Sequence, residues 1–239
     1  MHKPYCLALV VMLTACGGQN TKSATNDEAT VPADTTGGEW VTLFDGTSTD
    51  QWRNYRQDTL SDKWRVEGET LTLTERGGGD IITQGEYEDF ELELEWKISE
   101  AGNSGIFFHV VEADTLDAVY LTGPEMQILD DERHPDAKRG RDGNRTAGAN
   151  YDLTPPSRAS KPAGEWNRVR LVVDDGRVEH YLNGERVVAY ELWSDEWNEM
   201  VAASKFGKMP TYGKARRGHI ALQDHGDRVW FRNVRIREL

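Results

Sequence analysis

The chain has 239 residues, which is enough for one sizeable hydrophobic core or two small ones. Asp and Glu number 41 against 28 Lys and Arg, and a net charge of −13 argues against nucleic acid as a partner. Both cysteines, Cys6 and Cys16, lie near the amino terminus, so the rest of the chain offers no thiol for a disulfide, a nucleophile or a zinc ligand.

Residues 1–15 have the features of a secretory signal. Lys3 gives a positive start, and the apolar run over residues 6–13 is too short to span a bilayer. The run ends in Leu13-Thr-Ala-Cys, which resembles the lipobox of bacterial lipoproteins. The alternatives are an ordinary signal peptide or a transmembrane helix. The resemblance implies cleavage before Cys16, lipidation of Cys16, and attachment to a bacterial membrane on the periplasmic or cell-surface side.

Residues 16–38 are predicted to be a flexible tether. They are rich in Gly, Thr, Asn, Ala and Asp and have almost no large apolar residue. From residue 39 the sequence pattern changes to short segments of alternating apolar and polar residues separated by turns, so we expect a single domain over residues 39–239.

Most of this domain is predicted to be antiparallel strands. The segments are residues 39–46, a hairpin over residues 64–74, then residues 89–99, a strand over 106–111 after a turn at 103–105, 123–130, a meander over 166–192, and finally 218–226 and 229–237. Residues 194–200, with Ser194 as cap, are the one expected helix. Many short strands with little helix predict an all-β, two-sheet sandwich.

The strand over residues 89–99 shows the clearest alternation of apolar and charged residues. Glu91, Glu93 and Glu95 alternate with a large apolar set. Paired carboxylates carry glycosidase chemistry, but these three share one face of one strand. We therefore interpret them as the solvated outer face of a sheet.

The strand over residues 123–130 runs out into an acidic loop. Glu125 and Gln127 project to the face opposite Met126 and Ile128, which we place in the core. Carboxylates and His134 then crowd within a few positions, beginning at Asp130. They could form a metal or acid–base site, whereas spacing alone favours a solvated acidic loop.

Four further features bear on a site. His109 falls in a strand, in register with Phe107, where a hydrogen-bonded core histidine is the usual role. The long loop over residues 131–162 can dock Tyr151 back onto the sheet. The basic stretch from Lys205 is expected to be a loop, and Gln223 shares one strand face with His219.

The motifs together resemble the 3-keto-disaccharide hydrolase domain family over residues 39–239. They are Leu43-Phe-Asp-Gly, Asp89-Phe-Glu-Leu, Gly102-Asn-Ser-Gly-Ile, Glu125-Met-Gln-Ile-Leu-Asp, Gly164-Glu-Trp-Asn, Leu182-Asn-Gly, Gly218-His-Ile-Ala-Leu-Gln-Asp-His-Gly and Phe231-Arg-Asn-Val. The resemblance implies a concanavalin-like, lectin-like jelly roll with long functional loops. It also implies a substrate oxidised at carbon 3, supplied by a sugar 3-oxidoreductase.

A ketone at carbon 3 acidifies the proton on carbon 2, so the implied chemistry needs a general base and a positive group at the developing oxyanion. We expect catalytic roles for Glu125, His134 and His225. A divalent cation held by Asp130 and His134 could polarise the ketone, with His109 or His225 completing its site. The expected sugar-binding residues are Gln127, Tyr151, Gln223 and Lys205.

Three functions compete. The first is a lipid-anchored lyase or hydrolase of 3-keto-glycosides. The second is a non-catalytic carbohydrate-binding module of the same fold, and the third is an ordinary glycosidase with two well-spaced carboxylates. The ionisable cluster near Glu125 and Asp130 favours an enzyme, because a sugar-binding groove does not require several histidines.

Overall fold

The structure is a computed structural model that describes residues 37–239. The predicted signal, Cys16 and all but the last two residues of the predicted tether lie outside the described residues. Among those that are described, no helix is long and apolar enough to cross a membrane.

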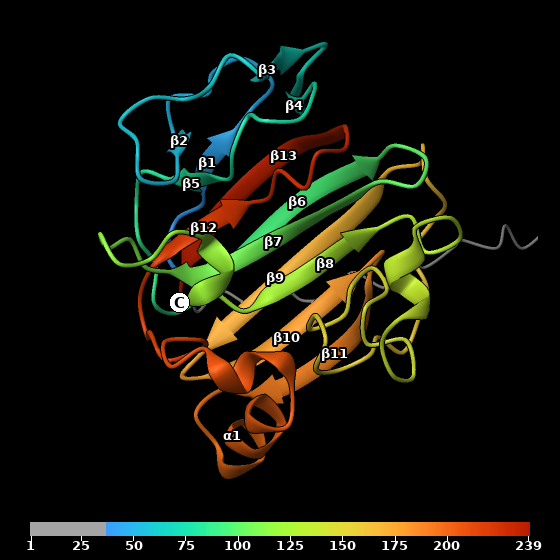
Figure 1. Cartoon of the computed structure of the whole chain (residues 1–239). Coiled ribbons are helices and arrows are strands. Elements are labelled where there is room, and N and C mark those ends of the chain that lie inside the picture. Colours follow the sequence, from blue (N-terminus) through green and yellow to red (C-terminus); the bar gives the residue numbers. More distant parts are fainter. Residues whose placement is uncertain (1–36) are drawn as a thin grey trace, which may run out of the picture. The chain divides into compact units, whose positions relative to one another are not determined.

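Two antiparallel sheets form the domain (Figure 1). The eight-stranded sheet has the order β11-β10-β9-β6-β13-β4-β3, with β1 also paired to β13. Its strands are β1 Val41–Phe44, β3 Trp64–Glu67, β4 Thr70–Leu73, β6 Phe90–Ile98, β9 Asn167–Asp174, β10 Arg177–Leu182, β11 Glu185–Glu191 and β13 Val229–Glu238. The five-stranded sheet has the order β2-β5-β12-β7-β8. Its strands are β2 Trp52–Asn54, β5 Ile81–Thr83, β7 Asn103–Val110, β8 Glu125–Leu129 and β12 His219–Leu222.

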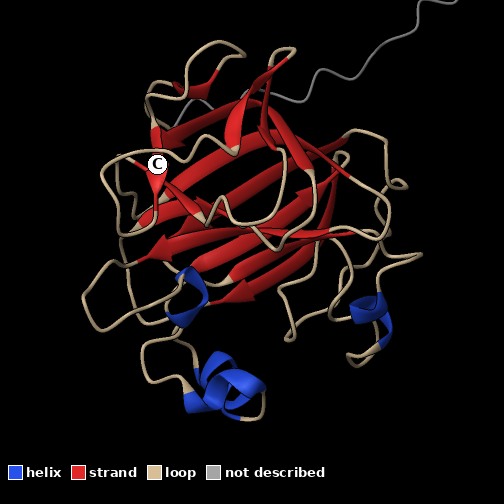
Figure 2. Cartoon of the chain, turned by 45° about the horizontal axis from the view of Figure 1, so that its top comes forward, coloured by secondary structure: helices blue, strands red, loops and turns tan. Residues whose placement is uncertain are grey.

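Within residues 37–239, helix is confined to short elements at the edges of the sandwich (Figure 2). They are α1 Asp195–Ala202 and three 3₁₀ turns, η1 Val119–Leu121, η2 Pro135–Lys138 and η3 Lys205–Lys208. The Ser194 hydroxyl accepts the Trp197 N–H, which confirms the predicted cap. Lys205 was expected in a loop, and instead it opens η3. The prediction of an antiparallel two-sheet sandwich with little helix is confirmed.

The core lies between the sheets and follows the alternation of the strands. Leu92, Leu94 and Trp96 of β6 meet Met126 and Ile128 of β8 in one buried cluster. This arrangement confirms that the opposite face of β8 is free to carry Glu125 and Gln127.

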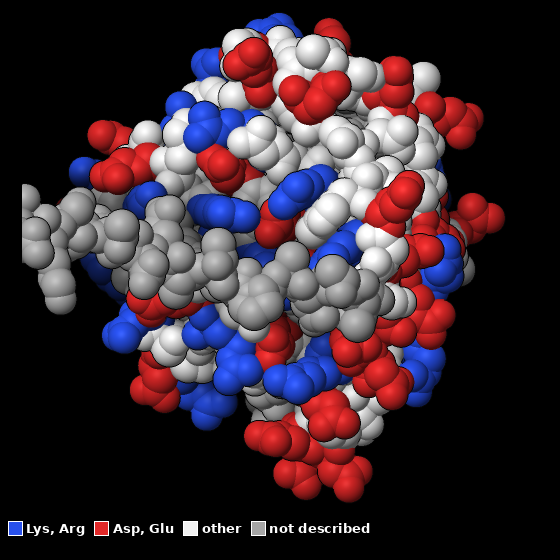
Figure 3. Space-filling view, turned by 180° about the vertical axis from the view of Figure 1, so that it is seen from behind, with Lys and Arg blue, Asp and Glu red and all other residues white. Residues whose placement is uncertain are grey.

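The three glutamates of β6 lie on the outer face, as predicted, but they are covered by arginines. Each carboxylate pairs with side chains of neighbouring strands, and Glu91 is only 4% exposed. The pairs are Glu91 with Arg170 and Arg237, Glu93 with Arg168 and Arg235, and Glu95 with Arg232. Seen from behind, the molecule shows Lys and Arg interspersed with Asp and Glu (Figure 3). Paired in this way, these carboxylates do not form a glycosidase site.

His109 does not keep the register that alternation predicts. Its φ of 52° is left-handed, and the pairing of β7 with β12 shifts at this point. The bulge turns the imidazole towards the core, where it packs on Phe90 and Phe108, and its Nε2 lies 2.8 Å from the carbonyl oxygen of Glu88. His109 therefore lies on the other side of the sheet from Phe107.

Candidate active site

A cleft of about 240 Å³ opens on the outer face of the five-stranded sheet. The sheet contributes side chains of β7 and β8, and the turn after β12, η1, η3 and the long loop complete the walls. Its lining residues are Asn103, Tyr120, Glu125, Gln127, Tyr151, Lys205, Phe206, Met209, Gln223 and His225. The expected sugar-binding residues Gln127, Tyr151, Gln223 and Lys205 are all brought together here.

Glu125 lies in the floor of the cleft with only 6% of its surface exposed. Burial raises the pKa of its carboxyl group from 4.5 to about 8; the charge of Lys205 opposes this shift, and the carboxylates of Asp80 and Asp136 add to it. The side chain is therefore mostly protonated at neutral pH and is a stronger base than an ordinary glutamate.

Tyr151 is held over the cleft by the long loop. Its N–H donates to the Glu125 carbonyl at 3.0 Å, so the loop docks onto β8 as predicted. Its hydroxyl donates to Asp136 at 2.7 Å, and Arg145 donates to the same carboxylate at 3.0 Å. The Lys205 Nζ lies 4.0 Å from the centroid of the Tyr151 ring, and burial lowers the pKa of this ammonium. The network fixes the tyrosine and holds a cation close to Glu125.

Three amide side chains in the cleft carry buried polar atoms with no hydrogen-bond partner among the described residues. The atoms are Oδ1 of Asn103, Nε2 of Gln127 and Oε1 of Gln223. Buried polar groups are nearly always paired in folded proteins, so unpaired ones that line a cleft point to a ligand. Two acceptors and one donor suit a molecule that carries several hydroxyl groups.

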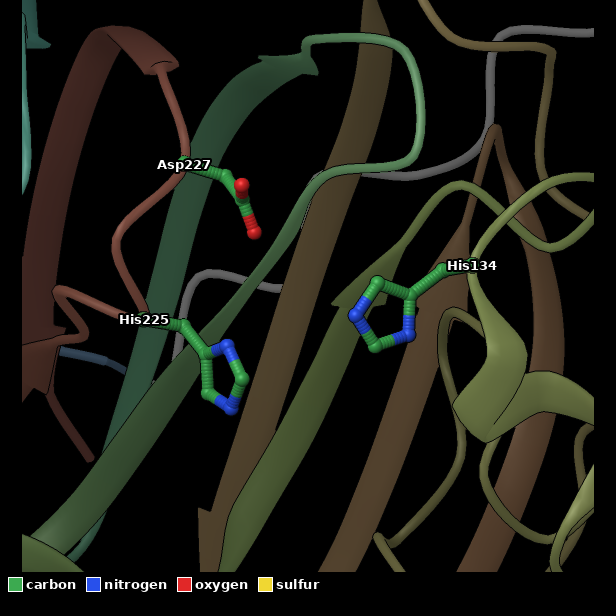
Figure 4. A group of neighbouring side chains, drawn as sticks. All are labelled: His134, His225 and Asp227. Atoms are coloured by element: carbon green, nitrogen blue, oxygen red, sulfur yellow. The ribbon is translucent and has the colours of Figure 1, made fainter.

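His134, His225 and Asp227 lie close together, and His225 of this group also lines the cleft (Figure 4). One ligand atom from each residue lies within 4.8 Å of the others. The two imidazole rings are 6.1 Å apart between centroids, and the Asp227 carboxylate accepts the N–H of Asn103 at 3.1 Å. Burial and the neighbouring His225 lower the pKa of His134, which favours the neutral imidazole that metals bind.

Only part of the expected metal site is formed. Asp130 does not join the group; its carboxylate instead accepts the backbone N–H groups of Ala101, Glu132 and Arg133 at 2.7, 3.2 and 3.3 Å. A carboxylate that ties a turn together in this way is a structural residue. His109 lies in the core, so His225 is the histidine that accompanies His134.

Sequence reasoning missed Asp227 as well as the cleft residues Asn103, Tyr120, Phe206 and Met209. Asp227 had a local signal, because it follows His225 and Gly226 in the polar turn after β12. Asn103 was assigned to a turn, whereas it begins β7.

Comparisons with known proteins identify the family. The model of the 3-keto-alpha-glucoside-1,2-lyase-like domain matches residues 39–237. A 3-keto-disaccharide hydrolase of Bacteroides thetaiotaomicron is 39% identical over 249 residues, covering 92% of this chain and 85% of the relative.

Solved structures give the same fold. A protein of Parabacteroides distasonis, provisionally described as a glycosyl hydrolase, is 33% identical with a TM-score of 0.77, over 84% of this chain and 94% of that one. A second from the same organism is 27% identical with a TM-score of 0.61, over 84% and 100%. A galectin-like protein of Bacillus subtilis, 14% identical with a TM-score of 0.54 over 84% and 94%, supports the jelly-roll fold alone. The chain therefore belongs to the 3-keto-disaccharide hydrolase family, a family of glycoside hydrolases and lyases whose domain is described as 3-keto-alpha-glucoside-1,2-lyase-like.

Proposed function

We propose that the protein cleaves glycosides oxidised at carbon 3 by removing the proton on carbon 2. The observation that carries this proposal is the Glu125 carboxyl group, buried in a cleft with its pKa raised to about 8, beside three amides whose buried atoms have no partner among residues 37–239. A binding module would need the amides but has no use for a buried, strongly basic carboxylate. The name of the Bacteroides relative supports a 3-keto-disaccharide as the substrate class.

The reaction begins with proton transfer from carbon 2 to the Glu125 carboxylate. The electrons of the C2–H bond move towards the carbon-3 ketone and leave negative charge on its oxygen. When the ketone re-forms, a double bond forms between carbons 1 and 2, the bond from carbon 1 to the glycosidic oxygen breaks, and the alcohol leaves with a proton. Water can then add across the double bond, which gives the free 3-keto sugar and net hydrolysis.

The other cleft residues bind and orient the sugar. Asn103, Gln127 and Gln223 can pair with hydroxyl groups that would otherwise bond to water. The Lys205 ammonium lies near Glu125, where it stabilises negative charge that develops on the substrate. His225 lines the same cleft and can exchange a proton with the departing alcohol.

We propose a divalent cation at His134, His225 and Asp227. Two imidazoles and one carboxylate suit a borderline metal such as zinc, and their ligand atoms lie within 4.8 Å of one another, so side-chain rotation would bring them around one ion. The His134 Nδ1 accepts the N–H of Asp136 at 3.2 Å, so the proton of the neutral ring is on Nε2. For Nε2 to bind a metal, this proton must move to Nδ1, and the turn over residues 134–136 must then adjust because Nδ1 no longer accepts the Asp136 N–H. Such a cation would supply Lewis-acid polarisation of the ketone.

The location and the partners complete the proposal. Lipidation of Cys16 would hold the domain at a bacterial membrane, on the periplasmic or cell-surface side. Because ordinary glycosides lack a ketone at carbon 3, an oxidoreductase acting on that carbon must supply the substrate.

The test is to incubate the purified protein with a 3-keto-glucoside, with and without a chelator, and to measure the released alcohol. Deuterium from heavy water should also exchange into carbon 2 of recovered substrate or product. Glu125→Gln should lower turnover about 100-fold or more, the scale of a general base. Glu93→Gln, on the opposite sheet, is the matched control and should stay active. Binding without release of alcohol would make the protein a carbohydrate-binding module instead.

A further inference from the structure

The two ends of the cleft differ in chemistry. Strand pairing fixes their order, because Asn103 pairs with Leu129, Gly105 with Gln127, and Phe107 with Glu125. The end near Asn103 carries the amides and the His134–His225–Asp227 group. The opposite end therefore lies beyond Glu125.

That second end is apolar and is formed by Tyr120, Phe206 and Met209. Tyr120 belongs to η1, which leads directly into β8. The segment that carries Phe206 and Met209 is tied to η1 by two hydrogen bonds of 2.8 Å, from Thr211 Oγ1 to the Leu121 carbonyl and from the Gly213 N–H to the Thr122 carbonyl. We refer to Tyr120, Phe206 and Met209 as the apolar wall.

The apolar wall is rigid on one side and exposed on the other. The Phe206 ring stacks on Tyr212 at 3.9 Å between centroids, and Tyr212 stacks in turn on Trp197, so Phe206 is held in place. Tyr120 is 43% exposed, and it is the one exposed large aromatic side chain among the described residues. An exposed aromatic ring beside a fixed one can receive a flat apolar surface.

We propose that the apolar wall binds the leaving group, with Tyr120 as its specificity-determining residue. This inference rests on the proposed function. Glu125 must lie against carbon 2, and the ketone and hydroxyl groups of the sugar match the polar end. The four-residue step from Glu125 to Leu129 covers roughly 13 Å at about 3.3 Å per residue, which is room for one sugar ring on that side. The group on carbon 1 then falls on the far side of Glu125, against the wall.

An apolar surface accepts leaving groups of different chemistry but selects among them by size and flatness. A phenyl group or the apolar face of a second sugar can each stack on Tyr120, because neither needs a hydrogen bond in a fixed direction. A methyl group is too small to cover the ring. The wall should thus favour glycosides with a flat leaving group over those with a small alkyl one.

The experiment compares phenyl and methyl 3-keto-glucosides with wild type, Tyr120→Ala and Tyr120→Phe. Tyr120→Ala should raise KM for the phenyl compound about 10-fold, the effect of losing one apolar contact in a pocket, and leave KM for the methyl compound unchanged. Tyr120→Phe keeps the ring and should behave as wild type. Val66→Ala, an exposed apolar residue on β3, is the control for surface truncation.

Binding gives a second readout that does not depend on turnover. In a Glu125→Gln background, calorimetry with both compounds should show the same selective loss when Tyr120→Ala is added. Equal effects on phenyl and methyl compounds, or no effect on either, would overturn the assignment of the wall. Failure of wild type to cleave either compound would instead count against the proposed function, so the two failures are distinguishable.

Discussion

The carboxyl group of Glu125 lies against the Cα atom of Gly105, in the space that a Cβ atom would occupy. A Cβ built on Gly105 would collide with the Oε1, Cδ and Cγ atoms of Glu125. The two residues face each other diagonally across β7 and β8, since Gly105 pairs with Gln127. The absence of a side chain on one strand thus sets where the proposed base lies on the next.

Gly105→Ala should therefore lower turnover while the fold persists. A displacement of about 1 Å at the reacting group can cost on the order of 100-fold in rate. The measurements are kcat, KM and the pH profile of kcat/KM, because a carboxyl group moved into a different environment also changes its pKa. Glu125→Asp in the Gly105→Ala background shortens the side chain and should recover part of the loss. Wild-type kinetics in Gly105→Ala would show that the close contact is unimportant.

The raised pKa of Glu125 makes stability depend on pH. An ordinary glutamate in the unfolded chain ionises above about pH 4.5, whereas the folded carboxyl stays protonated until about pH 8. The folded state therefore binds the extra proton in this window, and the free energy of unfolding falls as pH rises through it. Glu125→Gln does not titrate and should escape this loss.

The difference in unfolding free energy between Glu125→Gln and wild type should grow from pH 5 to pH 8, by at most roughly 1.4 kcal/mol per pH unit. Urea denaturation at both pH values measures it, and Glu132→Gln, on an exposed turn, is the control. A difference that does not change with pH would mean that the carboxyl is already ionised in the folded protein.

The strands and most turns of this domain could be predicted from the sequence because their signals are local. The period-two alternation of β6 predicts a half-buried strand, and the glycine between β3 and β4 predicts a turn. The same logic placed Glu125 and Gln127 on the face opposite the core. Because that face of β8 lines the cleft, both residues are cleft residues.

The residues that were misplaced depend on features with no local signal. His109 changes faces because one residue adopts a left-handed φ, and periodicity assumes that no bulge occurs. Asp130 uses its carboxylate on nearby backbone N–H groups, including that of Ala101 on another segment. Asp227 approaches His134 only because its loop is bonded to the start of β7, at Asn103, beside the end of β8.

Localisation can be tested through the cysteine of the predicted lipobox. Cys16→Ser removes the thiol that would carry the acyl chains, so the protein should move from the membrane to the soluble fraction. Cell fractionation followed by immunoblotting gives the readout. Cys6→Ser, within the predicted signal, should leave the protein in the membrane fraction. Retention of Cys16→Ser in membranes would refute the lipid anchor.

The last prediction separates Asp130, which the sequence suggested as a metal ligand, from Asp227, which it did not. Asp227 is one of the three grouped ligands, whereas Asp130 bonds to backbone N–H groups. Asp227→Asn and His225→Ala should each lose bound zinc, measured as metal content after dialysis and as calorimetric affinity for zinc alone. Zinc should also shift the amide resonance of Asp136 in the wild type, because its N–H now donates to His134.

Asp130→Asn is the matched control, because it makes the same change of charge in the loop that carries His134. It should keep zinc but lower the unfolding free energy by about 1–3 kcal/mol, because backbone N–H groups that the carboxylate now satisfies would lose their acceptor. The combined result discriminates between a metal site and a solvated turn. Asp227→Asn should lose zinc and keep its stability, whereas Asp130→Asn should keep zinc and lose stability. If wild type and Asp227→Asn bound zinc equally weakly, the cation would leave the mechanism, and His225 would remain as a proton-transfer residue in the same cleft as Glu125.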